Sequence, residues 1–69
     1  MNRFELARYE AGLTITDAAR RANVSERTIR RAEDQGTEQP TAPIVMALAK
    51  AYDKTVAWLL DAETDSKAA

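Results

Sequence analysis

Residues 14–33, TITDAARRANVSERTIRRAE, contain two short helical patterns on either side of a tight-turn signal. Thr14, followed three residues later by Asp17, forms a variant of the capping box, which predicts the start of a helix. Asn23 tolerates the left-handed backbone conformation that a tight turn requires. Ser25 is a good N-cap residue for the next helix. The stretch therefore predicts two short helices joined by a tight turn.

The rest of the chain also has a helical composition. It contains only two Gly and two Pro, Ala is abundant, and runs of β-branched residues are absent, which favours helices over strands. The expected helices span residues 2–11, 14–22, 25–34, 41–52 and 55–60. Thr41 is the expected N-cap of the fourth helix, with Pro43 acceptable in its first turn. We therefore expect an all-α fold of five helices, in which the second and third form a helix-turn-helix.

Apolar and small residues recur at helical spacing and predict the core. The expected core residues are Phe4, Ala7, Ala11, Ala18, Ala19, Ala22, Ile29, Ala32, Ile44, Leu48, Ala51, Val56 and Leu59, with Val45 as a further candidate. Residues 1–61 are expected to form one domain, and residues 62–69 a polar, flexible tail.

The composition excludes several classes of function. Without Cys the chain cannot form disulfides or thiolate metal sites, and without His it lacks the commonest metal ligand and general base. We therefore expect no catalytic residue, no metal site and no cofactor. No apolar run approaches the roughly 20 residues of a membrane span, and no signal peptide is recognisable. We expect a soluble, cytoplasmic protein.

The charge is unevenly distributed along the chain. The formal net charge is only −1, but residues 1–31 carry seven basic and four acidic residues, which gives +3. Residues 32–69 carry three basic and seven acidic residues, which gives −4. Such asymmetry between the two halves indicates a charged partner, which the small net charge of the whole chain would not suggest.

Three arginines fall within five residues of the third expected helix. On a helical wheel Arg27, Arg30 and Arg31 share one face, and Ile29 and Ala32 lie on the opposite, core-facing side. A solvated face is the ordinary explanation for charged helix residues, but such a face usually mixes its signs. Arginine also reads guanine and phosphate through paired donors. The cluster therefore predicts a surface that binds nucleic acid.

A series of residues also gives the chain a family resemblance. The residues are Arg8, Gly12–Leu13–Thr14, Ala19, Val24–Ser25, Ile29, Glu33, Pro40, Leu48–Ala51 and Val56–Leu60. In this order and spacing, residues 3–61 resemble the Cro and phage-repressor type of helix-turn-helix domain, also called the xenobiotic-response-element family. The resemblance implies a lambda-repressor-like fold of five helices. It also implies binding to a two-fold operator in double-stranded DNA as a homodimer, with the third helix in the major groove.

The resemblance implies roles for individual residues of that helix. Glu26, Arg27 and Arg31 match positions that reach base edges, and we expect the two arginines to read guanines. Arg30 is expected to contact either a base or a phosphate. Glu26 has two interpretations, which the sequence leaves open: it accepts a hydrogen bond from a cytosine amine, or it pairs with Arg30 one helical turn away.

Hydroxyl side chains near the helix starts, and one amide side chain in the loop after the third helix, are candidates for phosphate contacts. These candidates are Thr14, Thr16, Ser25, Thr28 and Gln35, with capping as the first role of Ser25. Ile15 stands where the family often has a long polar residue, and the loop after the third helix carries Asp34 and Glu38 but no Lys or Arg. We therefore expect modest non-specific affinity and a shallow salt dependence.

Four other charged residues receive structural interpretations. Arg8 and Glu33 stand where the resembled family carries a partly buried ion pair between the first and third helices. Arg20 and Arg21 lie on the side of the second helix away from its alanines, so we expect them to be solvated or weakly steering.

The fifth expected helix carries more apolar side chains than one helical face can bury. Leu59 and Val56 are assigned to the core. Trp58 and Leu60 are candidates for the dimer interface, and the alternative for Trp58 is that it closes the core.

These features favour a sequence-specific transcriptional regulator, most simply a small phage-type repressor such as a Cro protein or immunity repressor. Two alternatives remain: the antitoxin of a toxin–antitoxin pair, and a protein-interaction module that kept the fold without DNA binding. We expect no enzymatic activity, no membrane association and no small-molecule ligand.

Overall fold

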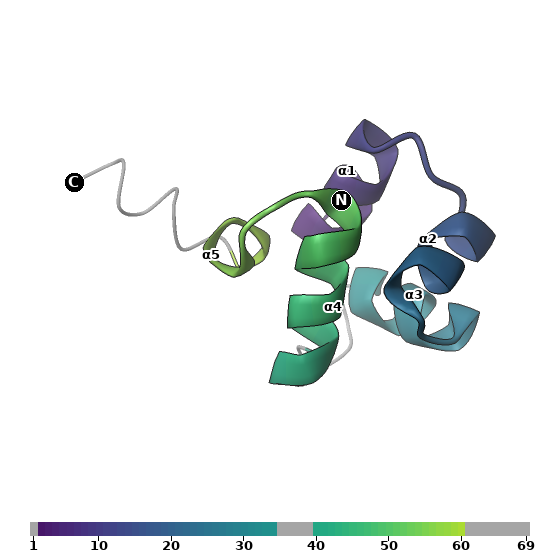
Figure 1. Cartoon of the computed structure of the whole chain (residues 1–69). Helices are drawn as coiled ribbons and strands as arrows, with labels where there is room; N and C mark the ends of the chain where they lie inside the picture. Colours follow the sequence, from purple (N-terminus) through teal and green to yellow (C-terminus); the bar gives the residue numbers. More distant parts are fainter. Residues whose placement is uncertain (1, 35–39, 61–69) are drawn as a thin grey trace.

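The computed structural model of the chain describes residues 2–34 and 40–60, which form five α-helices and no strand (Figure 1). The helices are α1 (Arg3–Glu10), α2 (Ile15–Ala22), α3 (Glu26–Glu33), α4 (Ala42–Tyr52) and α5 (Val56–Leu59). The expected all-α fold of five helices is confirmed, with boundaries within one or two residues. Gln35, the loop residue Glu38 and the tail 62–69 lie outside the described residues.

Side-chain caps explain where most of the helices begin. Asn2, Thr14, Ser25 and Thr55 each accept a hydrogen bond from the backbone N–H three residues later. Such a cap satisfies one of the unpaired donors at a helix start. Asp17 also accepts from the backbone N–H of Thr14, which completes the predicted capping box.

The predicted N-cap of α4 is correct in its position, but the expected side-chain hydrogen bond is absent. Thr41 occupies the N-cap position of α4, but its side chain makes no capping hydrogen bond. An N-cap side chain bonds to the N–H of the second or third helical residue. Pro43 is the second helical residue here and has no N–H, but the other four caps use the N–H three residues on, so Pro43 does not account for the missing bond.

Three residues with left-handed backbones mark the turns. Gly12 (φ +72°) lies between α1 and α2, Asn23 (φ 59°) between α2 and α3, and Asp53 (φ 59°) between α4 and α5. Glycine adopts this conformation without penalty, and Asn and Asp tolerate it better than most residues. The predicted role of Asn23 is confirmed, and so is the break at Asp53.

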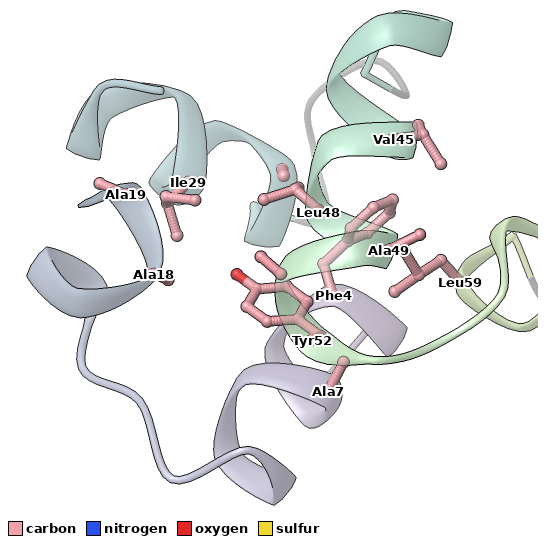
Figure 2. Packing of buried hydrophobic residues seen from close by; sticks show 12 residues of the cluster. Phe4, Ala7, Ala18, Ala19, Ile29, Val45, Leu48, Ala49, Tyr52 and Leu59 are labelled. Carbon is pink, nitrogen blue, oxygen red and sulfur yellow. The ribbon is translucent and has the colours of Figure 1, made fainter. Parts of the chain in front are cut away.

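The core surrounds α4, which packs against α1, α2 and α5. Figure 2 shows Phe4 of α1 close to Leu48 and Tyr52 of α4. Ile29 and Leu48 are the largest fully buried side chains of the described chain. The buried set is Phe4, Ala7, Ala18, Ala19, Ile29, Ala32, Val45, Leu48, Ala49, Ala51, Tyr52 and Leu59.

Two predicted core residues are exposed. Ala11 is exposed because α1 ends at Glu10, which makes Ala11 the C-cap. Val56 is 38% exposed, whereas Leu59 is 2% exposed. A helix of a single turn presents few positions to the core, and Leu59 takes that place in α5. Ile44 and Ala22 are partly buried against the core.

Candidate nucleic-acid interface

Small residues let α2 approach its neighbours closely. Ala18 and Ala19, on the inner side of α2, are 0% and 7% exposed. On α3 the matching residues are Ile29 and Ala32, at 0% and 5% exposed. The left-handed turn at Asn23 joins the two helices, which pack against each other (Figure 1). This local sequence fixes α3 with one side in the core and the other side outward.

A buried ion pair fixes α3 against α1. The Arg8 guanidinium donates from Nε to Glu33 Oε2 at 2.7 Å and from Nη2 to Glu33 Oε1 at 3.0 Å. A third bond runs from Arg8 Nη1 to the carbonyl oxygen of Leu13 at 3.0 Å. Only 8% and 9% of the two side chains are exposed. The hydrogen bonds from Arg8 to Glu33 raise the pKa of Arg8 above its ordinary value. The ion pair implied by the family resemblance is confirmed.

A second contact joins the start of α1 to the end of α3. Asn2, the cap of α1, also donates from Nδ2 to the carbonyl oxygen of Ala32 at 2.7 Å. Together with the Arg8 pair, this bond fixes the C-terminal end of α3 against α1. Sequence reasoning missed it, since its partners are 30 residues apart and nothing in the local pattern indicates the contact.

The arginine cluster lies on the outward side of α3. Arg27, Arg30 and Arg31 are all exposed, and the buried residues of α3 lie opposite, as the helical wheel predicts. Within residues 2–34 and 40–60, Arg27 and Arg31 form no ion pair, so their guanidinium groups are available to an external anion. Arg30 donates from Nη2 to Glu26 Oε1 at 3.3 Å.

Glu26 connects the starts of the two helices. Besides its bond with Arg30, its Oε2 accepts a hydrogen bond from Thr16 Oγ1 of α2 at 2.9 Å. Glu26 therefore makes the predicted pair with Arg30, and its contact with a base stays a prediction. The Thr16 contact was not predicted, because it joins residues of different helices whose relative orientation the sequence pattern does not give.

The other hydroxyl candidates lie at the same helix starts. Thr14 and Ser25 are the caps of α2 and α3, and Ser25 Oγ lies 2.9 Å from Thr28 Oγ1. Thr14, Thr16 and Ser25 are exposed, and Thr28 is partly exposed. The bond between Thr16 and Glu26 brings the two N-termini close together, where backbone N–H groups and hydroxyls favour a phosphate.

Arg20 and Arg21 lie on the exposed side of α2, in agreement with the expectation for the pair. Arg21 also donates from Nη1 to the carbonyl oxygen of Ala51 at 3.5 Å. This carbonyl belongs to the last turn of α4, where a positive charge is favourable. The contact gives Arg21 a structural role that Arg20 lacks.

The helix α5 lies on the other side of α4 from the α2–α3 pair (Figure 1). Trp58 is partly buried against the core, with Arg3 Cζ and Lys54 Nζ each 4.5 Å from its ring centroid. Leu60 is 37% exposed and borders an apolar groove between α4 and α5. The groove is lined by Pro40, Ala42, Val45, Met46, Val56 and Leu60.

Among residues 2–34 and 40–60, no helix is long and apolar enough to cross a membrane. The same residues bring together no group of three acidic side chains able to hold a metal ion.

The five helices and the α2–α3 geometry agree with the comparison against known families. Residues 2–59, from the cap of α1 to the end of α5, match a family described as "Helix-turn-helix domain". Searches of curated proteins and of solved structures each gave no match. The matched range covers most of the chain. The chain therefore belongs to the helix-turn-helix domain family of DNA-binding proteins.

Proposed function

We propose that this chain is a sequence-specific transcriptional repressor of the phage type, comparable to a Cro protein or immunity repressor. It acts in the cytoplasm, binds a two-fold operator as a homodimer, and inserts α3 into the major groove. It performs no catalysis and requires no cofactor. The mechanism is occupation of the operator, with base contacts supplying specificity and phosphate contacts supplying orientation.

The observation that carries the proposal is the two-sided character of α3. Ile29 and Ala32 are buried, and Arg27 and Arg31 lie exposed on the opposite side without intramolecular ion pairs within the described chain. A helix anchored on one side and bearing unpaired guanidinium groups on the other suits the major groove, where arginine donates two hydrogen bonds to guanine. We assign base reading to Arg27 and Arg31.

Phosphate binding is assigned to the hydroxyls at the helix starts. Thr14, Thr16, Ser25 and Thr28 surround the N-termini of α2 and α3, where backbone dipoles favour an anion. The hydroxyl of Thr16 donates its single proton to Glu26, so we assign the phosphate contact of Thr16 to its backbone N–H. Since these groups are neutral, they release fewer counterions than lysines would. The observed affinity should therefore depend only modestly on salt concentration.

The interface of the homodimer is assigned to the side of the molecule that carries α5. Leu60 contributes there to an apolar groove together with the exposed side chains of Met46 and Val56. A second copy related by a two-fold axis would cover the groove with the same residues. Trp58 contributes less than Leu60, since its ring already contacts Arg3 and Lys54.

The deciding experiment is selection of bound sequences from a random double-stranded DNA pool with the purified protein. We expect a palindromic motif with guanines at matching positions of half-sites about 34 Å apart, one helical turn. The combined variant Arg27→Ala/Arg31→Ala should lose the motif, and Arg20→Ala, which removes an exposed arginine from α2, should keep it.

Other results would favour other functions. Absence of any enriched motif would contradict the repressor proposal. A protein-interaction module would tolerate loss of Arg27 and Arg31 and fail on changes at Trp58. An antitoxin would bind DNA and also form a stable complex with a protein encoded beside it, which co-purification from the native host would detect.

A further inference from the structure

Glu26 is an unusual residue to find on a surface that binds DNA. It is the first residue of α3 and lies on the same helix as the exposed arginines. Its side chain is 42% exposed, so the carboxylate remains partly in contact with solvent. A negative charge at this place repels the phosphates of any duplex, whatever its sequence. Its presence weakens non-specific binding and needs a compensating role.

Both carboxylate oxygens of Glu26 already have partners in the free protein. Oε2 accepts from Thr16 at 2.9 Å, and Oε1 accepts from Arg30 at 3.3 Å. Each oxygen keeps a second lone pair, so the two bonds do not saturate the carboxylate, but together they hold its position between α2 and Arg30. The network fixes the carboxylate against α2 on one side and uses it to hold the Arg30 guanidinium on the other.

The direction of this restraint matters for reading DNA. Glu26 lies one turn before Arg30, so the bond draws the guanidinium toward the N-terminal end of α3. In helix-turn-helix complexes this end of the recognition helix contacts base edges. A guanidinium has five N–H donors. Arg30 can therefore donate one to Glu26 and still donate two to a guanine.

From this geometry we propose that Glu26 is a positioning residue that makes Arg30 a selective reader of guanine. The proposal rests on the proposed DNA-binding function. Glu26 directs the Arg30 guanidinium toward the base edges and away from the phosphate backbone. Its charge weakens binding to every duplex alike, so that only a duplex that offers Arg30 a guanine recovers the loss through the bonds of Arg30. Thr16 contributes by fixing the carboxylate to the start of α2.

The test is a binding series on the selected operator, on operators with single base changes, and on unrelated duplex DNA at one salt concentration. We expect Glu26→Ala to strengthen binding to unrelated DNA by about twofold to tenfold, because one repulsive charge is lost. We also expect it to lower discrimination at the base pair read by Arg30 by about fivefold or more. Glu26→Gln keeps an acceptor oxygen without the charge and should fall between Glu26→Ala and the parent protein.

A double-mutant comparison separates positioning from direct reading. In an Arg30→Ala background, Glu26→Ala should cause no further loss of discrimination at any base pair, because both changes act through one guanidinium. If Glu26→Ala still relaxes one position there, Glu26 reads that base directly and the proposal is wrong. Thr16→Val, which keeps the shape of the side chain but removes the donor, should give a weaker version of the Glu26→Ala effect.

A measurement without DNA completes the design. The Nε–H signal of Arg30 in NMR relaxation of the free protein should show lower order in Glu26→Ala than in the parent, and the signal of Arg27 should not change. Unchanged order for Arg30 would overturn the restraint itself. If the parent selects no DNA motif, the proposed function fails and this inference fails with it. If it selects a motif but the effects of Glu26→Ala and Arg30→Ala are additive, only the inference fails.

Discussion

The helix α3 carries two Arg–Glu ion pairs in opposite environments. Glu33, its last residue, pairs with Arg8 of α1 at 2.7 Å, and about nine-tenths of both side chains is buried. Glu26, its first residue, pairs with Arg30 at 3.3 Å, where the side chains are 42% and 64% exposed. The same chemistry therefore occurs at both ends of one helix, with water excluded at one end only.

The difference separates folding from recognition. The buried carboxylate of Glu33 has no water to replace Arg8, so breaking this pair leaves an uncompensated charge in the interior. The exposed carboxylate of Glu26 exchanges partners with water at little cost. An ion pair that holds an exposed side chain available to a ligand belongs in the second environment, and one that fixes α3 against α1 belongs in the first.

The largest expected effect is the loss of the buried pair. Arg8→Ala should lower the free energy of unfolding by about 3–5 kcal/mol, because Glu33 would remain buried and charged. Urea denaturation followed by circular dichroism would measure the change, with Arg20→Ala as the exposed control, expected within about 0.5 kcal/mol of the parent.

A paired replacement keeps this prediction testable if Arg8→Ala does not fold. Arg8→Met combined with Glu33→Leu removes both charges and retains apolar volume, so it should lose less stability than Arg8→Ala alone. A loss below about 1 kcal/mol in Arg8→Ala would show that the buried pair contributes no more to stability than the exposed one.

A smaller effect concerns Tyr52, which is 3% exposed and whose hydroxyl has no hydrogen-bond partner among the described residues. Burial, followed by the charge of Glu33, raises the pKa of Tyr52 to about 12 from its ordinary value of 10. Because this pKa is raised in the folded state, the contribution of Tyr52 to the free energy of unfolding is fully present below pH 10. This contribution is lost as the pH rises toward 12, by roughly 2 kcal/mol in total.

The matched variant for this effect is Tyr52→Phe. Without the hydroxyl, it should retain stability at neutral pH and lose less stability than the parent above pH 10. The free energy of unfolding of both proteins should be measured between pH 8 and pH 11.5. Subtracting the value of the variant from that of the parent at each pH cancels the titration of the remaining groups. Parallel curves for the two proteins would contradict the assignment to Tyr52.

The fold was predictable wherever a local signal determines the structure. The caps at Thr14 and Ser25 and the turn at Asn23 follow from the chemistry of single residues, and the two-sided α3 follows from helical periodicity. Thr41 is the N-cap but makes no side-chain bond, and Pro43 does not account for this, since the other four caps use the N–H three residues on. Val56 was misplaced because a helix of one turn is too short for its periodicity to identify a buried side.

The exposure of the arginines on one side of α3 was predictable from the sequence, whereas the contacts of the candidate site were not. The exposed arginines were identified from spacing and residue type alone. The bond from Thr16 to Glu26 depends on the relative orientation of α2 and α3. The sequence pattern shows that small residues line the contact between the two helices, but it does not give their orientation. The pairing of Glu26 with Arg30 was one of two alternatives on sequence grounds, and the choice required the side-chain positions.

The smallest expected effect is on stability at the exposed pair. Glu26→Ala and Arg30→Ala should each change the free energy of unfolding by no more than about 0.5 kcal/mol, because water solvates whichever partner remains. A double-mutant cycle by urea denaturation should give a coupling of about 0.3 kcal/mol that shrinks in 1 M salt, where screening is stronger. A coupling above about 1 kcal/mol would make the exposed pair a structural element like the buried one. Loss of DNA selectivity in Glu26→Ala could then arise from a displaced α3, so a small coupling is the condition under which selectivity reports the position of Arg30.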